Sequence, residues 1–158
     1  MAIGDCRMTE LKSSNVMTKD DLKTRTKQFA LRVLILVDAL PNSKSGRAID
    51  GQLVRSGTSV GSNYRAACRS RSRAEFMAKF GIVEEEADES AFWLKSITDH
   101  KLLKEARVKS LRTEAGELTA IMAASRIFAS RNAKASTINR QSDVRPQSAI
   151  GNRQSAIP

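Results

Sequence analysis

Residues 72–98 read SRAEFMAKFGIVEEEADESAFWLKSIT and carry the most regular pattern in the chain. Apolar and small residues recur alternately every four and every three positions, which is the spacing of a heptad seam. The seam consists of Phe76, Phe80, Val83, Ala87, Ser90, Leu94 and Ile97. A seam of this length predicts a long helix that buries one face against other helices.

Three further segments repeat this pattern. A first helix is expected to begin at Thr18, where a hydroxyl residue is followed by two aspartates, and to end before Pro41. A second is expected over about 47–69 and a fourth over about 107–133, each with apolar residues at three-four spacing. Four long helices with short connections predict an all-α fold, an antiparallel up-down four-helix bundle over residues 17–135.

The second helix contains three glycines, Gly51, Gly57 and Gly61. Each should cost about 1 kcal/mol relative to alanine in a helix interior. Gly57 and Gly61 lie four residues apart, on one face, among small serines. This arrangement predicts that another helix approaches closely at these two glycines.

Both ends of the chain fall outside the pattern. Residues 1–16 are expected to form a flexible extension. Residues 136–158 are expected to form a low-complexity disordered tail, because the segment QSAI at 147–150 recurs at 154–157 among few large apolar residues. A tail that supports RNA binding through its arginines is the alternative interpretation. Those arginines are Arg140, Arg145 and Arg153.

Composition excludes several classes of protein. Aromatic residues make up 4% of the 158 residues, and glycine and proline are sparse, which argues against a β-sandwich. With one histidine, His100, the chain cannot build a multi-histidine metal site, and a histidine-based triad is not expected. Two cysteines are too few for a disulfide scaffold. No membrane span or signal peptide is recognised, so a cytoplasmic protein is expected. No catalytic motif is recognised either, and a protein without catalytic residues, cofactor or metal is expected.

Apolar residues outnumber those that a bundle core needs. Leu31 and Leu34 extend the apolar surface of the first helix around its circumference, and Ile82 and Trp93 lie outside the seam of the third. Contiguous exposed apolar surface usually marks an interface, so these four residues are predicted to form a homo-oligomer contact. A thick core, with Trp93 packed against a loop, is the alternative.

The acidic run Glu84–Glu89 allows two interpretations. Carboxylates such as Glu85 and Glu89 could bind metal in a bundle, but the known di-metal sites of bundles need Glu-x-x-His pairs, and this helix has no histidine. A solvated face, or a partner for basic neighbours, is favoured.

Positive charge gathers where the second helix meets the third. Between residues 65 and 83 the chain carries five basic residues and one acidic residue, Glu75. The basic residues are Arg65, Arg69, Arg71, Arg73 and Lys79. The formal charge of +10 and the fit of guanidinium to phosphate suggest a nucleic-acid surface. The alternative is a basic coat that serves solubility. Base stacking has little support, because apart from Tyr64 the aromatic residues of this segment, Phe76 and Phe80, belong to the apolar seam.

Two ordered motifs carry a family resemblance. Residues 52–67, QLVRSGTSVGSNYRAA, are followed by SRAEF at 72–76, GIVEEEADES at 81–90 and then Trp93-Leu94. The chain resembles, over about residues 17–133, the small proteins encoded in intervening sequences of bacterial 23S ribosomal RNA genes. Many members carry a glutamate near the position of Ala66, which this chain lacks.

The resemblance implies an up-down bundle that assembles as a homo-pentamer with a central channel. It brings no catalytic residues with it. A relative in diversity-generating retroelements has a similar fold and a basic surface, and it binds a reverse transcriptase and nucleic acid. The expected function is therefore a non-enzymatic homo-oligomer that binds RNA or DNA. The alternative is an adaptor that docks a partner protein such as a reverse transcriptase.

Overall fold

The computed structural model describes residues 17–142, with side chains as far as Arg131. Within residues 17–142 the chain forms four α-helices and no strand. Their bounds are α1 Lys19–Val37, α2 Lys44–Ala67, α3 Arg73–Asp99 and α4 Glu105–Ser142. The predicted all-α class is confirmed.

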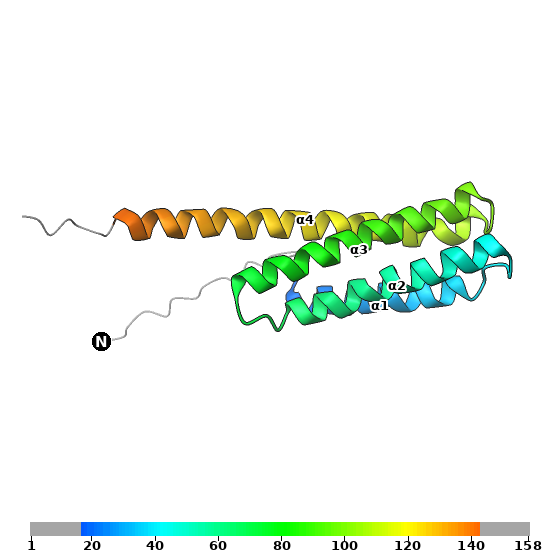
Figure 1. Cartoon of the computed structure of the whole chain (residues 1–158), viewed down its shortest axis with the longest axis horizontal. Helices are drawn as coiled ribbons and strands as arrows, with labels where there is room; N and C mark the ends of the chain where they lie inside the picture. Colours follow the sequence, from blue (N-terminus) through cyan, green and yellow to red (C-terminus); the bar gives the residue numbers. More distant parts are fainter. Residues whose placement is uncertain (1–16, 143–158) are drawn as a thin grey trace, which may run out of the picture.

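The helices run alternately up and down in one bundle (Figure 1). The start of α1 and the α2–α3 turn lie at one end, and the α1–α2 and α3–α4 turns lie at the other. The pairs α2/α3 and α3/α4 pack most extensively, α1/α2 slightly less, and α1/α4 least. The antiparallel up-down order predicted from the short connections is thus the order observed.

The predicted seams form the core. In α3, every seam residue from Phe80 to Ile97 is buried, and Phe76 is partly buried against the core. The core is completed from α1 by residues such as Phe29 and Val33, from α2 by Leu53, Val60 and Tyr64, and from α4 by Leu111, Leu118 and Met122. The hydroxyls of Ser56 and Ser90 meet at 3.0 Å within this core and join α2 to α3. A buried hydroxyl requires such a partner.

Hydroxyl residues set three helix starts. Thr18 caps α1, and its side chain and backbone exchange hydrogen bonds with Asp21, which lower the pKa of the Asp21 carboxyl. Ser72 caps α3 in the same position. Ser43 caps α2 by accepting from the Gly46 amide, so α2 begins three residues before the predicted Arg47. The sequence interpretation had assigned that serine to the turn.

Of the three glycines singled out in the sequence, two face α1, as predicted. A Cβ atom on Gly57 would lie 2.8 Å from both γ-methyl groups of Val33, and one on Gly61 would lie 3.1 Å from the carbonyl oxygen of Thr26. Gly51 has open space around it and is exposed. Close approach between helices therefore explains Gly57 and Gly61 but not Gly51. Gly46, in the first turn of α2, is also closely packed, because a Cβ there would overlap the Pro41 carbonyl oxygen.

Helix α4 is longer than predicted. Its 38 residues span about 57 Å, and it projects beyond the start of α3 (Figure 1). Residues 136–142, assigned from the sequence to a disordered tail, are helical, which corrects that boundary. The physical reason is that no glycine or proline interrupts the chain between Gly116 and Pro146, and an existing helix extends at little cost. The expectations for residues 1–16 and 143–158 lie outside the described residues.

Hydropathy along the described helices gives no membrane span. None of the helices in residues 17–142 combines the length and the apolar character that crossing a bilayer requires.

Candidate functional site

A groove of about 880 Å³ runs between α1 and α2, at the end of the bundle where α1 begins and α2 ends. Five basic residues and one acidic residue, Asp20, line it. The basic residues are Lys19, Lys23 and Lys27 of α1 with Arg65 and Arg69 of α2. We call this feature the basic groove. Its remaining lining is small or uncharged, and consists of Thr24, Gln28, Ala30, Thr58, Gly61, Ser62 and Cys68.

Small residues create the groove. The α2 backbone at Gly61 approaches the α1 carbonyl of Thr26 so closely that a side chain could not fit without displacement. Thr26 itself is fully buried, and its hydroxyl donates to the Lys23 carbonyl at 3.1 Å. Close packing at Gly61 thus brings the two helices together beneath the space that the basic side chains line.

Two lysines of the basic groove have protein partners. Lys19 donates from Nζ to the carbonyl oxygen of Cys68 at 2.9 Å, where α2 ends, and cations are favoured at a helix C-terminus. Lys23 pairs with Asp20 at 3.1 Å. The Tyr64 hydroxyl also donates to the Lys19 carbonyl at 3.3 Å, and burial raises the pKa of Tyr64, so this phenol stays protonated. These contacts fasten the start of α1 to the end of α2.

Three cations of the basic groove lack such partners in the described part of the chain. No carboxylate among residues 17–131 lies within 4.0 Å of the charged groups of Lys27, Arg65 or Arg69. Arg65 and Arg69 are exposed, as is Lys27. Within the described residues, three cations without a carboxylate partner thus surround one groove and give it a positive potential.

The structure divides the basic cluster predicted from the sequence. Arg65 and Arg69 line the basic groove, whereas Arg71 and Arg73 are exposed at the α2–α3 turn and the first residue of α3. Lys79 lies farther along α3 and is half-buried. The Arg71 amide donates to the Glu75 carboxylate at 2.9 Å, so the acidic residue of this segment caps the start of α3.

The lysines of α1 were not assigned to the site from the sequence. Their four-residue spacing places Lys19, Lys23 and Lys27 on one face of α1, so the sequence itself predicts a basic face there. Two other basic residues of α1, Arg25 and Arg32, face α4 instead and pair with Glu114. Helical spacing places Arg25 and Arg32 on a different face from the three lysines, and the packing of the helices decides which neighbour each face meets.

The acidic run of α3 partners basic neighbours, as favoured from the sequence. Arg55 of α2 pairs with Glu86 at 3.3 Å and also with Glu89. Burial raises the pKa of the Glu86 carboxyl, while the hydrogen bonds from Arg55 and Trp93 lower that of Glu89. Glu85 is exposed, and no group of three potential metal ligands forms among the described residues.

Trp93 is less exposed than its position outside the seam suggested, and its role in an oligomer contact stays a prediction. It is half-buried against the core, and its indole N–H donates to Glu89 at 3.0 Å. The neighbouring Phe92 is the outward residue, 59% exposed, and its ring meets the edge of Trp93. Because Glu89 also pairs with Arg55 of α2, the partly buried Trp93 lies beside this link between α2 and α3.

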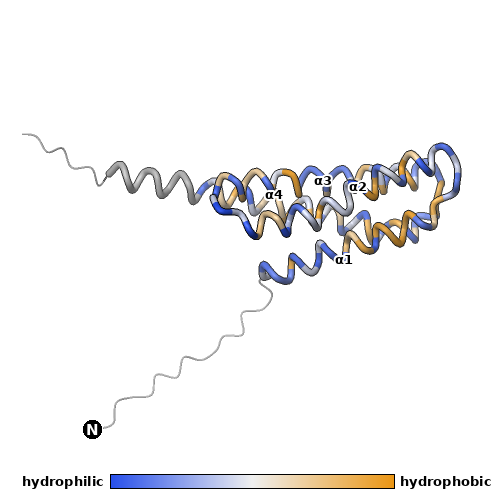
Figure 2. Tube along the Cα trace, turned by 60° about the horizontal axis from the view of Figure 1, so that its bottom comes forward, coloured by the Kyte–Doolittle hydropathy of each residue, from blue (hydrophilic) through white to orange (hydrophobic). Residues whose placement is uncertain are grey.

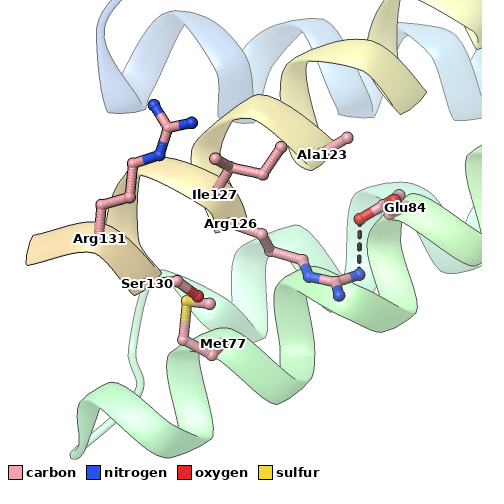
Figure 3. Close-up of a pocket in the computed structure, with 7 residues that line it drawn as sticks. All are labelled: Met77, Glu84, Ala123, Arg126, Ile127, Ser130 and Arg131. Atoms are coloured by element: carbon pink, nitrogen blue, oxygen red, sulfur yellow. Dashed lines mark hydrogen bonds and ion pairs between the residues drawn. The ribbon is translucent and has the colours of Figure 1, made fainter. Parts of the chain in front are cut away.

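A second hollow, of about 410 Å³, lies between α3 and α4 (Figure 3). Figure 3 shows Arg126 of α4 reaching toward Glu84 of α3, and the two groups pair at 2.6 Å. Arg131 points away from this pair. The hollow is smaller than the basic groove and its central arginine is neutralised, so it is the weaker candidate for binding an anion.

Large exposed apolar side chains lie on α1, on α3 and, as Ile127 and Phe128, on α4. The N-terminal half of α1 is hydrophilic and its C-terminal half hydrophobic (Figure 2). Leu31, Leu34 and Ile35 are exposed there, Ile35 to 70%, as predicted for the two leucines. Ile82 of α3 is exposed as well.

Comparison with known proteins agrees with this architecture. The family model of the 23S rRNA-intervening sequence protein matches residues 19–124, and no curated protein matches the chain. A solved structure of a protein of unknown function from the S23 ribosomal protein family of Bacteroides thetaiotaomicron is 30% identical, with a TM-score of 0.60. The match covers 64% of this chain and 94% of that one. Because the family model extends from the start of α1 through most of the bundle, the chain belongs to the 23S rRNA-intervening sequence protein family.

Proposed function

We propose that the protein is a non-enzymatic bundle that binds RNA or DNA through the basic groove. The observation that carries this proposal is the convergence of Lys27, Arg65 and Arg69 on one groove, without a carboxylate partner among the described residues. Guanidinium and ammonium groups bind phosphate oxygens, and release of condensed counterions from the nucleic acid then drives association.

Filter binding to a structured RNA and to DNA across a salt series tests the proposal. We expect binding that weakens linearly on a logarithmic salt scale. The variant Lys27→Ala/Arg65→Ala/Arg69→Ala should lose about tenfold or more in affinity, and its salt slope should fall by about 0.7–0.9 for each phosphate contact removed.

The matched control is Lys104→Ala/Lys109→Ala, which removes exposed lysines at the opposite end of the bundle. Its affinity should stay within about twofold of the wild type if the basic groove is the site. Equal losses in both variants would instead assign binding to a diffuse basic coat. An absence of binding at low salt would reject the proposal and leave a protein partner, such as a reverse transcriptase, as the alternative.

The protein is further proposed to act as a homo-oligomer. The exposed apolar stripe of Leu31, Leu34 and Ile35 supports this, because contiguous apolar surface favours association. The family resemblance favours a pentamer. A ring of subunits would repeat the basic groove and so multiply its field.

Replacing Leu34 with aspartate should shift the protein toward monomer, because it places a charge within this stripe. Light scattering coupled to size-exclusion chromatography measures the change. Ala48→Asp, at an exposed position of α2, is the control and should keep the wild-type mass. Leu34 is a cleaner probe than the predicted Trp93, whose truncation would also disturb the core. A monomeric wild type would contradict the oligomer.

A further inference from the structure

The basic residues of the groove form two facing rows. Lys19, Lys23 and Lys27 follow one another at intervals of four residues on α1, and Arg65 and Arg69 do so on the antiparallel α2. Four residues of helix rise about 6 Å, so each row places one cation per turn. This spacing is comparable with the separation of successive phosphates along one nucleic-acid strand.

The lining offers little that could read bases. No aromatic side chain lines the basic groove, so bases have no platform on which to stack. The hydroxyls of Thr58 and Ser62 donate to carbonyls of their own helix, at 2.7 and 3.2 Å. Thr24 and Gln28 are the other uncharged polar side chains that could hydrogen-bond, whereas five lining residues are cationic, so contacts with phosphate predominate over contacts with base edges.

The width of the groove selects against a duplex. Packed helices have axes about 8–10 Å apart, so the groove between two of them is narrow. A duplex is wider than this, because its major groove, which is only one part of it, is already about 12 Å wide. A duplex could therefore touch only the rims, while a single strand could enter and contact both rows. Close approach of the helices at Gly61 keeps the floor narrow.

We infer that the basic groove holds the sugar–phosphate backbone of a single strand, about one phosphate per helical turn, with the bases turned toward solvent. The protein then binds single-stranded RNA and DNA without sequence preference, and Lys27, Arg65 and Arg69 contact the phosphates. This inference rests on the proposed function and specifies its ligand. Three phosphate contacts predict a salt slope of about −2 for a single strand.

Fluorescence anisotropy with labelled 12-nucleotide probes tests the inference. The probes are oligo(U), oligo(dT), a mixed-sequence strand and a blunt duplex of the same sequence. We expect the single strands to bind within about threefold of one another and at least tenfold more tightly than the duplex.

A groove-filling variant separates entry into the groove from attraction to its charge. Ser62→Leu adds bulk to the lining without altering charge, and leucine cannot stack on a base as an aromatic residue could. It should weaken single-strand binding about tenfold and leave duplex binding unchanged. Ala48→Leu, exposed on α2 away from the basic groove, is the control, and circular dichroism verifies that both variants are folded.

The outcomes distinguish the two proposals. Duplex binding as tight as single-strand binding, a strong sequence preference, or full affinity in Ser62→Leu would overturn the inference while the proposed function stands. If no probe binds even at low salt, the proposed function itself fails.

Discussion

Gly57→Leu should destabilise the bundle by about 3 kcal/mol or more. This is the largest effect that we expect of any single substitution in α2 that leaves the charge unchanged. Gly57 is buried, and even the first carbon of a side chain would lie 2.8 Å from both methyl groups of Val33. The remaining three carbons of leucine would enter the α1/α2 contact, so the helices must separate. Urea unfolding followed by circular dichroism measures the loss.

Gly51 is the matched control, and the expected change in stability has the opposite sign there. Gly51 lies on the same helix, is exposed, and has no neighbour within 4 Å of an added Cβ. Gly51→Leu should therefore stabilise the protein by up to about 1 kcal/mol through helix propensity alone. Val33→Ala combined with Gly57→Leu should cost less than the two single changes together, because the first makes room for the second. Similar stabilities for the two glycine variants would contradict close packing at Gly57.

Glu114→Ala should destabilise the protein by about 1–2 kcal/mol, because it removes the carboxylate that Arg25 and Arg32 share and leaves Arg25 with Glu117 alone. Glu114 is 15% exposed and pairs with both Arg25 and Arg32. Arg32 also donates to the Ser110 hydroxyl at 2.8 Å. The pair α1/α4 packs least of the neighbouring helices, and the Glu114 cluster links these two helices.

Thermal and urea unfolding at two salt concentrations measures the effect. The difference between the wild type and Glu114→Ala should shrink in 1 M NaCl, where the Debye length falls to about 3 Å. Glu85→Ala is the control, since Glu85 is exposed on α3, and its stability should change by no more than about 0.5 kcal/mol. Equal losses from the two changes would show that the arginine cluster does not hold α1 to α4.

The sequence predicted that four helices form and which face of each is buried, whereas it did not predict all of the helix boundaries. The seam from Phe76 to Ile97 identified the buried face of α3, because a helix places every third and fourth residue together. The end of α4 was missed, since a polar composition was interpreted as disorder where no residue breaks the helix. The polarity of a segment limits what it can bury but does not prevent helix propagation.

Only part of the candidate site was predicted from the sequence. Arg65 and Arg69 were selected because they are close in sequence, and they do line the basic groove. Arg71 and Arg73 were selected for the same reason and lie outside its lining. Proximity along the chain measures distance only within one helix, so it could not bring Lys27 of α1 into the site.

Trp93 illustrates the same limit for apolar residues. Its position outside the α3 seam indicated exposure, but a helix in a bundle has flanks that pack against neighbours as well as a central seam. The flank that carries Trp93 packs toward α2, where Glu89 accepts its indole N–H and is itself paired with Arg55. Exposure on such a flank depends on the partner helix.

The sequence alone therefore determined four helices, their inward faces and their up-down order. Helical periodicity, capping residues and short connections are local properties of the chain. Only the tertiary structure decided which charges meet: Arg32 with Glu114, Arg55 with Glu89, and the lysines of α1 with the arginines of α2 around one groove. The reason is physical, because the relative register and rotation of two helices follow from how their side chains fit together, as at Gly57 and Val33.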